Sequence, residues 1–410
     1  MLGKFKHIYF SAGYNIPLII SFLLPFGINY AIYILFWTIC FFVFDDVKAG
    51  LRRMHQNKWS YVLLGFFLVH SVGYFFSIIR DGALNAIEIK LSFLAFPVLI
   101  YAANYSELQV KKIVISFVSG CIVVSLLNLF RACYLYFFED INAFYYTDFS
   151  YFMHPSYFAM YLIFSQLIVL LFYPKWLIHL SHLNIKIGFM SIVFLITVFL
   201  CSSKMGLITA ILLLPLTFFV ILYNHGYRKI IGGLVIVFII SIAAAYKIFP
   251  TPFDRMQRAF KVSSSTETLD KTDTESTAVR ILIWKEAVKL IKTNILFGTT
   301  AGDANDKLVE AYEREGLTGA FSKRLNAHNQ FLQTFIGTGI IGFIVLLLMT
   351  LGALVYSFMK KNYILALFSV LCIFNFLVES MLQAQAGFVF FAFFFCFLTQ
   401  YNFHKLTKTT

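Results

Sequence analysis

Charged residues are scarce in this chain. Asp, Glu, Lys and Arg make up 13% of its 410 residues, whereas hydrophobic residues make up 60%. Soluble domains have about 25% charged residues, so the composition excludes an ordinary soluble protein. The apolar residues form runs close to the ~20 residues that a helix needs to cross about 30 Å of hydrocarbon. The sequence therefore predicts an all-α polytopic membrane protein in contact with membrane lipid.

The chain also lacks the motifs of several common chemistries. It has no Cys-x-x-Cys pair among its six cysteines, no His-Glu-x-x-His, no Walker loop, no Gly-x-Ser-x-Gly and no Asp-x-Asp-type motif. These absences argue against a zinc site, nucleotide hydrolysis and metal-assisted transfer from a nucleotide sugar. The net charge of +13 comes with no basic, aromatic-rich soluble module, which argues against nucleic-acid binding. We expect no cofactor, no metal and no nucleic-acid partner.

About twelve apolar segments have the length of membrane helices. A single long polar stretch interrupts them, so we expect helices one to nine within residues 1–248, a loop with an amphipathic helix at residues 249–326, and helices ten to twelve within residues 327–410. The segments lie at about residues 11–26, 28–44, 58–79, 89–104, 112–136, 155–173, 186–201, 205–223, 229–248, 327–358, 362–379 and 383–402.

Positive charge alternates along the chain. Lys and Arg concentrate in every second connection, and the positive-inside rule places such connections in the cytoplasm. Both termini are then cytoplasmic, and the loop at residues 249–326 faces the outer, periplasmic side. The basic residues of the cytoplasmic set are Lys4, Lys6, Lys48, Arg52, Arg53, Lys58, Lys111, Lys112, Lys175, Lys186, Arg228, Lys229, Lys360, Lys361, Lys405 and Lys408.

Residues 279–295 of this loop show helical periodicity. One side of the expected helix combines apolar residues with a tryptophan, and a row of lysines runs along it. An amphipathic helix of this composition is typical of a membrane surface, so we expect it to lie there. The apolar side comprises Ile281, Trp284, Val288 and Ile291, with Ile283 and Ala287 beside it, and the basic row comprises Lys285, Lys289 and Lys292.

Two candidate site residues lie in this outer loop or just after its end. His328 stands where the loop meets the next apolar helix, among polar neighbours that include Asn329. It is either part of a polar helix start or a general base that removes a proton from a sugar hydroxyl. Arg280 precedes Trp284 by four residues, so both project from one side of a helix. Arg280 is either a solvated arginine or a ligand for a diphosphate, which its forked N–H groups suit.

Two further charged residues lie at the outer ends of apolar segments. Lys204 follows two serines in a very short outer turn; a charge there either reaches the interface or faces a cavity. Glu379 is the only acid in the last two apolar segments. It either pairs with Lys204 or Arg280, orients His328, or extends into water.

At these positions the chain resembles the O-antigen ligase and polymerase superfamily. Its outer turn Ser203-Lys204-Met205-Gly206 is similar to a Ser-Arg-small-Gly pattern of that family. An arginine followed four residues later by Trp, and then by Phe-Gly, corresponds to Arg280, Trp284, Phe297 and Gly298. A His-Asn-x-aromatic-Leu-Gln motif with a downstream Gly-x-x-Gly corresponds to residues 328–333 and 339–342. These motifs lie within about residues 195–345.

The resemblance implies a metal-independent, inverting glycosyltransferase of the bacterial inner membrane, with its active site on the periplasmic face. Its donor is a glycan linked to undecaprenyl diphosphate. By resemblance, His328 is the catalytic base, Arg280 and Lys204 bind the donor diphosphate, and Asn329, Trp284 and Glu379 support them. Lys204 departs from the usual family arginine: lysine keeps the charge but loses two-pronged phosphate recognition.

The resemblance leaves the branch of the family open. A ligase transfers the finished glycan to lipid A-core, as expected in lipopolysaccharide biosynthesis; a polymerase transfers a growing O-antigen or exopolysaccharide glycan to the next repeat unit. We take the ligase reaction as the first hypothesis and the polymerase reaction as its alternative. A transporter of lipid-linked oligosaccharides is less favoured, because the unpaired ionisable groups gather at the outer rim of the expected helices. A non-catalytic scaffold is also less favoured, because it would not require the coincidence of His328, Arg280 and Lys204.

Overall fold

The computed structural model describes residues 15–177, 180–224, 270–274 and 277–402, and it is all-helical over these ranges. Packing groups the chain into two compact units. Among the described residues, one unit combines residues 29–105 with residues 270–274 and 277–402, and the other combines residues 15–28 with residues 106–177 and 180–224. Each unit therefore joins stretches that are far apart in the sequence. The expected helix at residues 229–248 and the loop residues 249–269 lie outside the described ranges.

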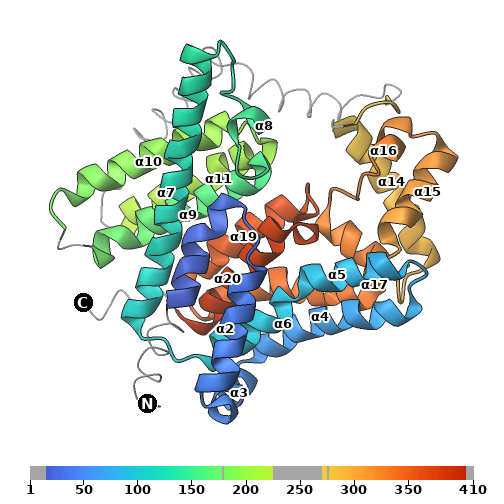
Figure 1. Cartoon of the computed structure of the whole chain (residues 1–410), viewed down its shortest axis with the longest axis horizontal. Coiled ribbons are helices and arrows are strands. Elements are labelled where there is room, and N and C mark those ends of the chain that lie inside the picture. The colour runs from blue at the N-terminus through green and yellow to red at the C-terminus, as the bar shows by residue number, and fades with distance from the viewer. Residues whose placement is uncertain (1–14, 178–179, 225–269, 275–276, 403–410) are drawn as a thin grey trace. The chain divides into compact units, whose positions relative to one another are not determined.

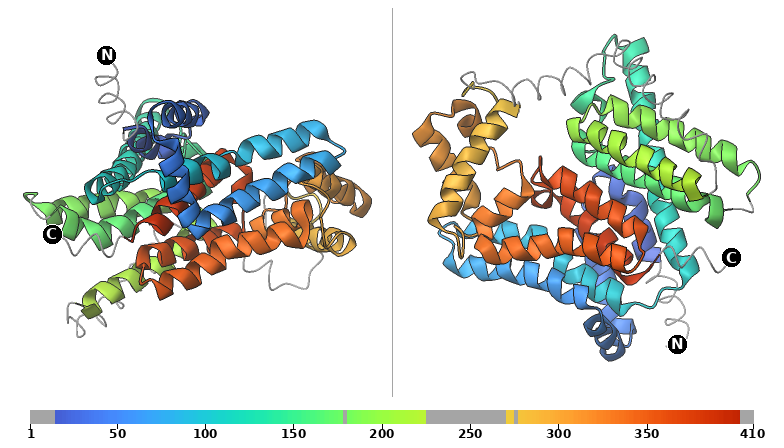
Figure 2. Two further views of the ribbon diagram at one scale, coloured as in Figure 1. Left: turned by 90° about the horizontal axis from the view of Figure 1, so that it is seen from below. Right: turned by 180° about the vertical axis from the view of Figure 1, so that it is seen from behind.

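The unit that contains residues 29–105 is built around a long helix near the C-terminal end of the chain. That helix, α17, packs against α4, and α4 packs against α5 and α6 (Figure 2). Its helices are α2 (Ala31–Phe44), α3 (Val47–Gln56), α4 (Lys58–Phe76), α5 (Arg80–Lys90), α6 (Ser92–Phe96), η2 (Pro97–Tyr101), α14 (Thr277–Thr293), α15 (Ala304–Glu315), α16 (Thr318–Ser322), α17 (Gln330–Leu347), η3 (Leu348–Gly352), α18 (Ala353–Met359), α19 (Tyr363–Phe376), η4 (Met381–Gln383) and α20 (Gln385–Gln400).

The other unit is centred on α9, which packs against α7, α10 and α11 (Figure 1). Most of α9 is buried, including all its residues from Tyr157 to Val169. Its helices are Asn15–Phe26, which ends in η1 (Leu24–Phe26), α7 (Glu107–Phe138), α8 (Tyr146–Phe149), α9 (Pro155–Trp176), α10 (Leu183–Leu200) and α11 (Lys204–Asn224).

Six described helices are long and apolar enough to cross a membrane, which supports the predicted membrane protein. They are Lys58–Phe76, Arg80–Tyr101, Glu107–Phe138, Pro155–Trp176, Leu183–Leu200 and Gln330–Met359. Shorter apolar helices occupy the other expected positions: Asn15–Phe26, Ala31–Phe44, Lys204–Phe218, Tyr363–Phe376 and Gln385–Gln400. The total of twelve stays a prediction, because residues 229–248 are not described and these helices are short.

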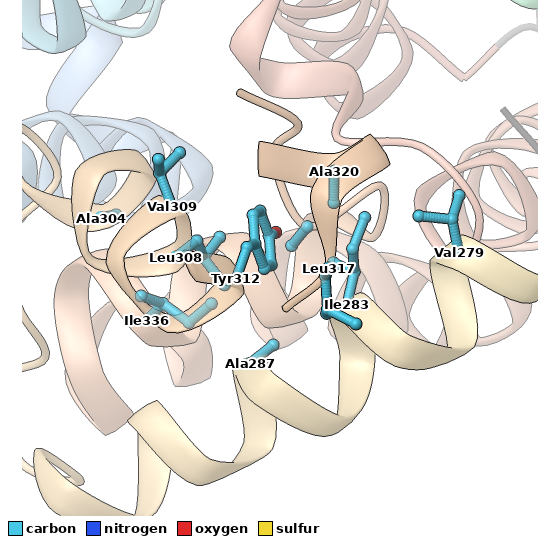
Figure 3. Close-up of a cluster of buried hydrophobic side chains, with 11 residues drawn as sticks. Val279, Ile283, Ala287, Ala304, Leu308, Val309, Tyr312, Leu317, Ala320 and Ile336 are labelled. Atoms are coloured by element: carbon cyan, nitrogen blue, oxygen red, sulfur yellow. The ribbon is translucent and has the colours of Figure 1, made fainter. Parts of the chain in front are cut away.

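The amphipathic helix of the loop is present as α14, but its apolar side packs against protein. Val279, Ile283 and Ala287 form the buried face of α14, whereas Val288, expected on the apolar side, is 40% exposed. This face belongs to a hydrophobic core with Leu308 and other residues of α15, α16 and α17 (Figure 3). We expected this helix on a membrane surface because the sequence did not reveal α15 and α16, the helices that cover its apolar face.

Helix α17 is broken at Gly339, where the loop segment after α14 crosses it. Gly339 has φ 61° and ψ −161°, a conformation that is essentially confined to glycine. The crossing segment supplies main-chain partners at the break: Ile340 N donates to Ile295 O (2.8 Å) and Thr299 N donates to Ile336 O (2.7 Å). Because unpaired backbone groups are costly in lipid, these bonds allow α17 to break near the membrane.

Asp303 fixes the other end of this segment. Its buried carboxylate accepts hydrogen bonds from Ser77 Oγ (2.7 Å), Ile78 N (3.0 Å) and Ile79 N (2.8 Å) in the corner between α4 and α5. Burial raises the pKa of Asp303, but the hydrogen bonds from Ile78, Ile79 and Ser77 outweigh it, so the pKa lies below its usual value. The loop is thus held against two membrane helices, α17 and α4.

We expect Gly339→Ala to destabilise the protein, because its Cβ would overlap the carbonyl oxygen of Leu296 and its φ would be strained. Strain of this kind costs about 1–3 kcal/mol before any overlap is counted. The thermal unfolding midpoint of the purified protein in detergent should fall by several degrees. Gly65→Ala in α4 is the matched control, since a Cβ there meets no atom within 4 Å. Equal midpoints for the two variants would contradict this account of the helix break.

Candidate active site

His328 sits on a tight turn immediately before α17. It adopts a left-handed conformation with φ 44°, which histidine tolerates better than most residues. Its backbone N–H donates to Asn326 Oδ1 (2.9 Å). Asn329 then caps α17, with its Oδ1 accepting from Leu332 N (3.1 Å). These polar neighbours therefore do cap the helix, as one interpretation of the sequence proposed, and they also fix the backbone from which His328 projects.

The imidazole of His328 meets the carboxylate of Glu379. Nδ1 lies 3.2 Å from Oε1 and 3.3 Å from Oε2, and the side chains of His328 and Glu379 are 20% and 13% exposed. In a neutral imidazole whose Nδ1–H donates to a carboxylate, Nε2 carries the lone pair. Because a carboxylate accepts hydrogen bonds, this contact favours the tautomer in which Nε2 can accept a proton.

Arg280 approaches the same carboxylate from the first turn of α14. Its NH1 donates to the carbonyl of Val378 (2.8 Å), and its NH2 lies 3.7 Å from Glu379 Oε2. The guanidinium is partly exposed, at 26%. Glu379 is thus shared by Arg280 and His328. The sequence left several alternatives open for Glu379. In the structure two of them occur together, because Glu379 pairs with Arg280 and also contacts His328.

The turn that carries Glu379 is held by the two residues that follow His328. Asn329 Nδ2 donates to Leu377 O (3.0 Å), and Asn329 N donates to Ser380 Oγ (3.3 Å). Gln330 Oε1 accepts from Leu382 N (2.7 Å). The His-Asn-Gln sequence therefore contains the candidate base, His328. Its Asn329 and Gln330 also fix the turn that carries Glu379, the residue that His328 contacts.

Trp284 fixes the chain just before His328. Its indole Nε1–H donates to Ala327 O (2.9 Å), and Ala327 N donates to Gln333 Oε1 (2.9 Å). The backbone N–H and the backbone carbonyl of Ala327 are thus both hydrogen-bonded to side chains. Since Trp284 lies one helical turn after Arg280, this contact also sets the position of α14 beside His328.

Lys90 is a residue of this region that sequence reasoning passed over. It lies in α5, is completely buried, and its Nζ donates to Leu382 O (3.4 Å), on the turn that also carries Glu379. Within the described ranges no carboxylate forms an ion pair with it. A lysine inside an apolar span is costly and usually functional. That signal was present in the sequence, but the helix was expected to begin at about residue 89, which put Lys90 at its outer end, whereas the helix begins at Arg80.

Lys204 belongs to the other unit, where it is the first residue of α11. It follows Ser202, which has φ 49°, and Ser203, whose Oγ accepts from Gly206 N (3.2 Å). Gly206 allows α11 to approach α9 closely, since a Cβ there would lie 2.6 Å from Ala159 Cβ. The short capped turn predicted here is present. A joint action of Lys204 with Arg280 stays a prediction.

The described residues contain no group of three or more His, Cys, Asp or Glu side chains arranged to hold a metal ion. The ionisable groups that the structure brings together are instead Arg280, Glu379 and His328, a cation, an anion and a base. Such a set can bind an anionic group beside a side chain that accepts a proton.

Comparison with known proteins agrees with this reading of the motifs. Residues 189–347 match the family model described as O-antigen ligase. The matched range contains the Ser203–Gly206 turn, Arg280 with Trp284, and residues 328–333, the motifs on which the resemblance rests. A search of curated proteins found no match to the chain. The match over residues 189–347 therefore supports the resemblance of the chain to the O-antigen ligase and polymerase superfamily.

Proposed function

We propose that the chain is an O-antigen ligase-like glycosyltransferase, which moves a glycan from an undecaprenyl-diphosphate donor to an acceptor hydroxyl at the periplasmic face of the inner membrane. The observation that carries this proposal is the contact of His328 Nδ1 with Glu379, on a carboxylate that Arg280 also approaches. This contact supports the proposal, because a transfer between an anionic leaving group and a hydroxyl requires a proton acceptor close to a cation.

His328 acts as the base in this proposal. The acceptor oxygen attacks the anomeric carbon of the donor sugar while its proton moves to Nε2 of His328. The bond from that carbon to the diphosphate oxygen breaks, and the diphosphate leaves with the electron pair. A single displacement of this kind inverts the anomeric centre. Glu379 stabilises the imidazolium that forms, and general-base catalysis of this type contributes roughly 10²–10⁴-fold to the rate.

Arg280 and Lys204 neutralise the diphosphate in place of a metal ion. A guanidinium has five N–H donors, and Arg280 directs NH1 to Val378 O, so its other donors remain suited to phosphate oxygens. Lys204 supplies a second positive charge from the capped turn before α11. Lipid A-core is the proposed acceptor. Polymerisation onto a second lipid-linked repeat unit is the alternative, because it uses the same base and the same leaving group.

His328→Ala should abolish transfer from a purified lipid-linked donor, lowering the rate by at least ~100-fold because the base is lost. The thermal unfolding midpoint should stay close to that of the parent, since His328 is not part of the hydrophobic core. His55→Ala is the matched control: His55 is exposed and its ring contacts the hydroxyl of Tyr61, so its loss should leave transfer unchanged. Near-parental turnover of His328→Ala, or inhibition by chelator that a divalent ion reverses, would contradict the mechanism.

Glu379→Gln separates the two contacts of the carboxylate. Transfer should fall about tenfold or more, because a neutral amide cannot stabilise the imidazolium of His328. Donor binding should be equal to that of the parent or tighter, because Arg280 no longer shares its charge with Glu379. Transfer rates and equilibrium binding of the same donor in nanodiscs measure the two effects. A parallel loss of binding and transfer would show that Glu379 acts only through folding of the site.

Removing either proposed diphosphate ligand should weaken donor binding. Arg280→Ala and Lys204→Ala should each raise the donor Kd by about tenfold, since a hydrogen bond to a charged group contributes roughly 1.5–3 kcal/mol. Lys204→Arg should be the best tolerated change at that site, because it restores the forked donor. Arg324→Ala is the control, since Arg324 is an exposed arginine of the same loop that pairs with Asp306. Parental affinity in both alanine variants would contradict the shared clamp.

One assay with two alternative acceptors distinguishes the ligase reaction from the polymerase reaction. The parent enzyme and a radiolabelled lipid-linked donor are mixed with lipid A-core in one reaction and with a second lipid-linked repeat unit in another. The ligase proposal expects label on lipid A-core. Exclusive formation of longer lipid-linked glycans would instead establish the polymerase reaction while leaving the role of His328 intact.

A further inference from the structure

Three consecutive apolar residues lie exposed directly after α14, outside every expected membrane segment. Ile295, Leu296 and Phe297 are 50%, 63% and 76% exposed. Polar residues flank them, with Lys292, Thr293 and Asn294 before and Thr299 and Thr300 after. We refer to residues 295–297 as the apolar tip. Exposure of three large apolar side chains in a row in a polar loop indicates a surface that is covered in the working protein.

The backbone of the apolar tip is fixed against a membrane helix. The bonds from Ile340 N to Ile295 O and from Thr299 N to Ile336 O connect it to both sides of the break in α17. Gly298 and Gly339 make the close approach possible, because a Cβ on Gly298 would overlap Ile336 O and one on Gly339 would overlap Leu296 O. The Phe-Gly and Gly-x-x-Gly motifs of the sequence are thus two sides of one contact.

This contact places the apolar tip well inside the span of α17. Gly339 lies nine residues after Gln330, the first residue of α17, which corresponds to about 13 Å along a helix. The exposed side of Gln330–Met359 continues from that point with large apolar side chains. They are Ile341, Ile344, Leu348, Leu351, Val355 and Phe358. Their spacing of three or four residues is that of one helix face, here the face of a membrane span.

We propose that the apolar tip enters the hydrocarbon layer of the outer leaflet, and that its partner is the acyl chains of the bilayer. The tip continues the lipid-facing stripe of α17 at its outer end. The membrane contact of the loop therefore lies after α14, and the apolar face of α14 itself belongs to the core with α15 and α16. Lys292, one turn before the tip, is placed to meet lipid phosphates, as basic residues beside interfacial anchors do.

A lipid-inserted tip has a consequence for the candidate active site. At its N-terminal end, helix α14 contacts the turn that carries Glu379, through the hydrogen bond from Arg280 to Val378 O. The tip attaches its other end to the outer leaflet. This arrangement fixes the height of Arg280 relative to the layer in which a lipid-linked diphosphate lies. The insertion itself is independent of the proposed chemistry and is measured without any assay of transfer.

Spin labelling tests the insertion. Cys133 is the one exposed cysteine among the described residues, so Cys133→Ser gives a background in which Phe297→Cys, Leu296→Cys and Lys292→Cys can be labelled one at a time. The unsubstituted background reports any label on buried cysteines. Each labelled protein is reconstituted into lipid nanodiscs, and its collision rates with oxygen and with a water-soluble nickel complex are compared by power saturation.

Labels at positions 296 and 297 should collide several-fold more often with oxygen than with the nickel complex, whereas the label at position 292 should show the reverse. A nickel-accessible label at both tip positions would overturn the proposal, because the tip would then be in water. Low collision rates with both reagents would also overturn it, by showing a protein partner or a second copy over the tip. Unfolding midpoints equal to that of the background confirm that each labelled protein is folded.

Discussion

The structure of the candidate site depends on one shared carboxylate. Glu379 contacts the imidazole of His328 through Nδ1 and lies beside the guanidinium of Arg280. Three parts of the chain far apart in the sequence, α14, the start of α17 and the turn before α20, meet at this group. A carboxylate with low exposure requires charged or hydrogen-bonding partners. The same requirement that stabilises Glu379 therefore brings the proposed base and the proposed donor ligand together.

The second constraint is the hydrogen bonding of backbone near the membrane. The loop segment at residues 295–303 runs against α17 and the corner between α4 and α5, where water cannot satisfy every peptide group. Glycines at 298 and 339 let two main chains approach closely enough to exchange bonds, and Asp303 accepts from two further N–H groups. The loop is consequently part of the membrane unit, and the residues it carries, Arg280 and Trp284, hold defined positions beside His328.

Much of this was predictable from the sequence, and the failures have physical causes. Hydropathy located the apolar helices, and the family motifs, expected within about residues 195–345, lie in the range 189–347 that the family model matches. Contacts of Glu379 with Arg280 and with His328 were two of the alternatives that the sequence left open. Periodicity located α14 but not its buried side, because a single helix does not reveal which neighbours cover it. Lys90 was missed because Arg80, Asp81 and Glu88 conceal the start of its helix. The approach of Gly298 to Gly339 is a long-range contact that no local pattern encodes.

The central claim is that Glu379 holds His328 in one tautomer within reach of a diphosphate bound by Arg280. A structure of the protein in nanodiscs with a non-transferable analogue of the lipid-linked donor tests it most directly. The account predicts diphosphate oxygens within hydrogen-bond distance of the Arg280 guanidinium, His328 Nδ1 still on Glu379, and Nε2 directed toward the anomeric carbon's open face. A diphosphate bound away from Arg280, or one that displaces Glu379 from Nδ1, would contradict it.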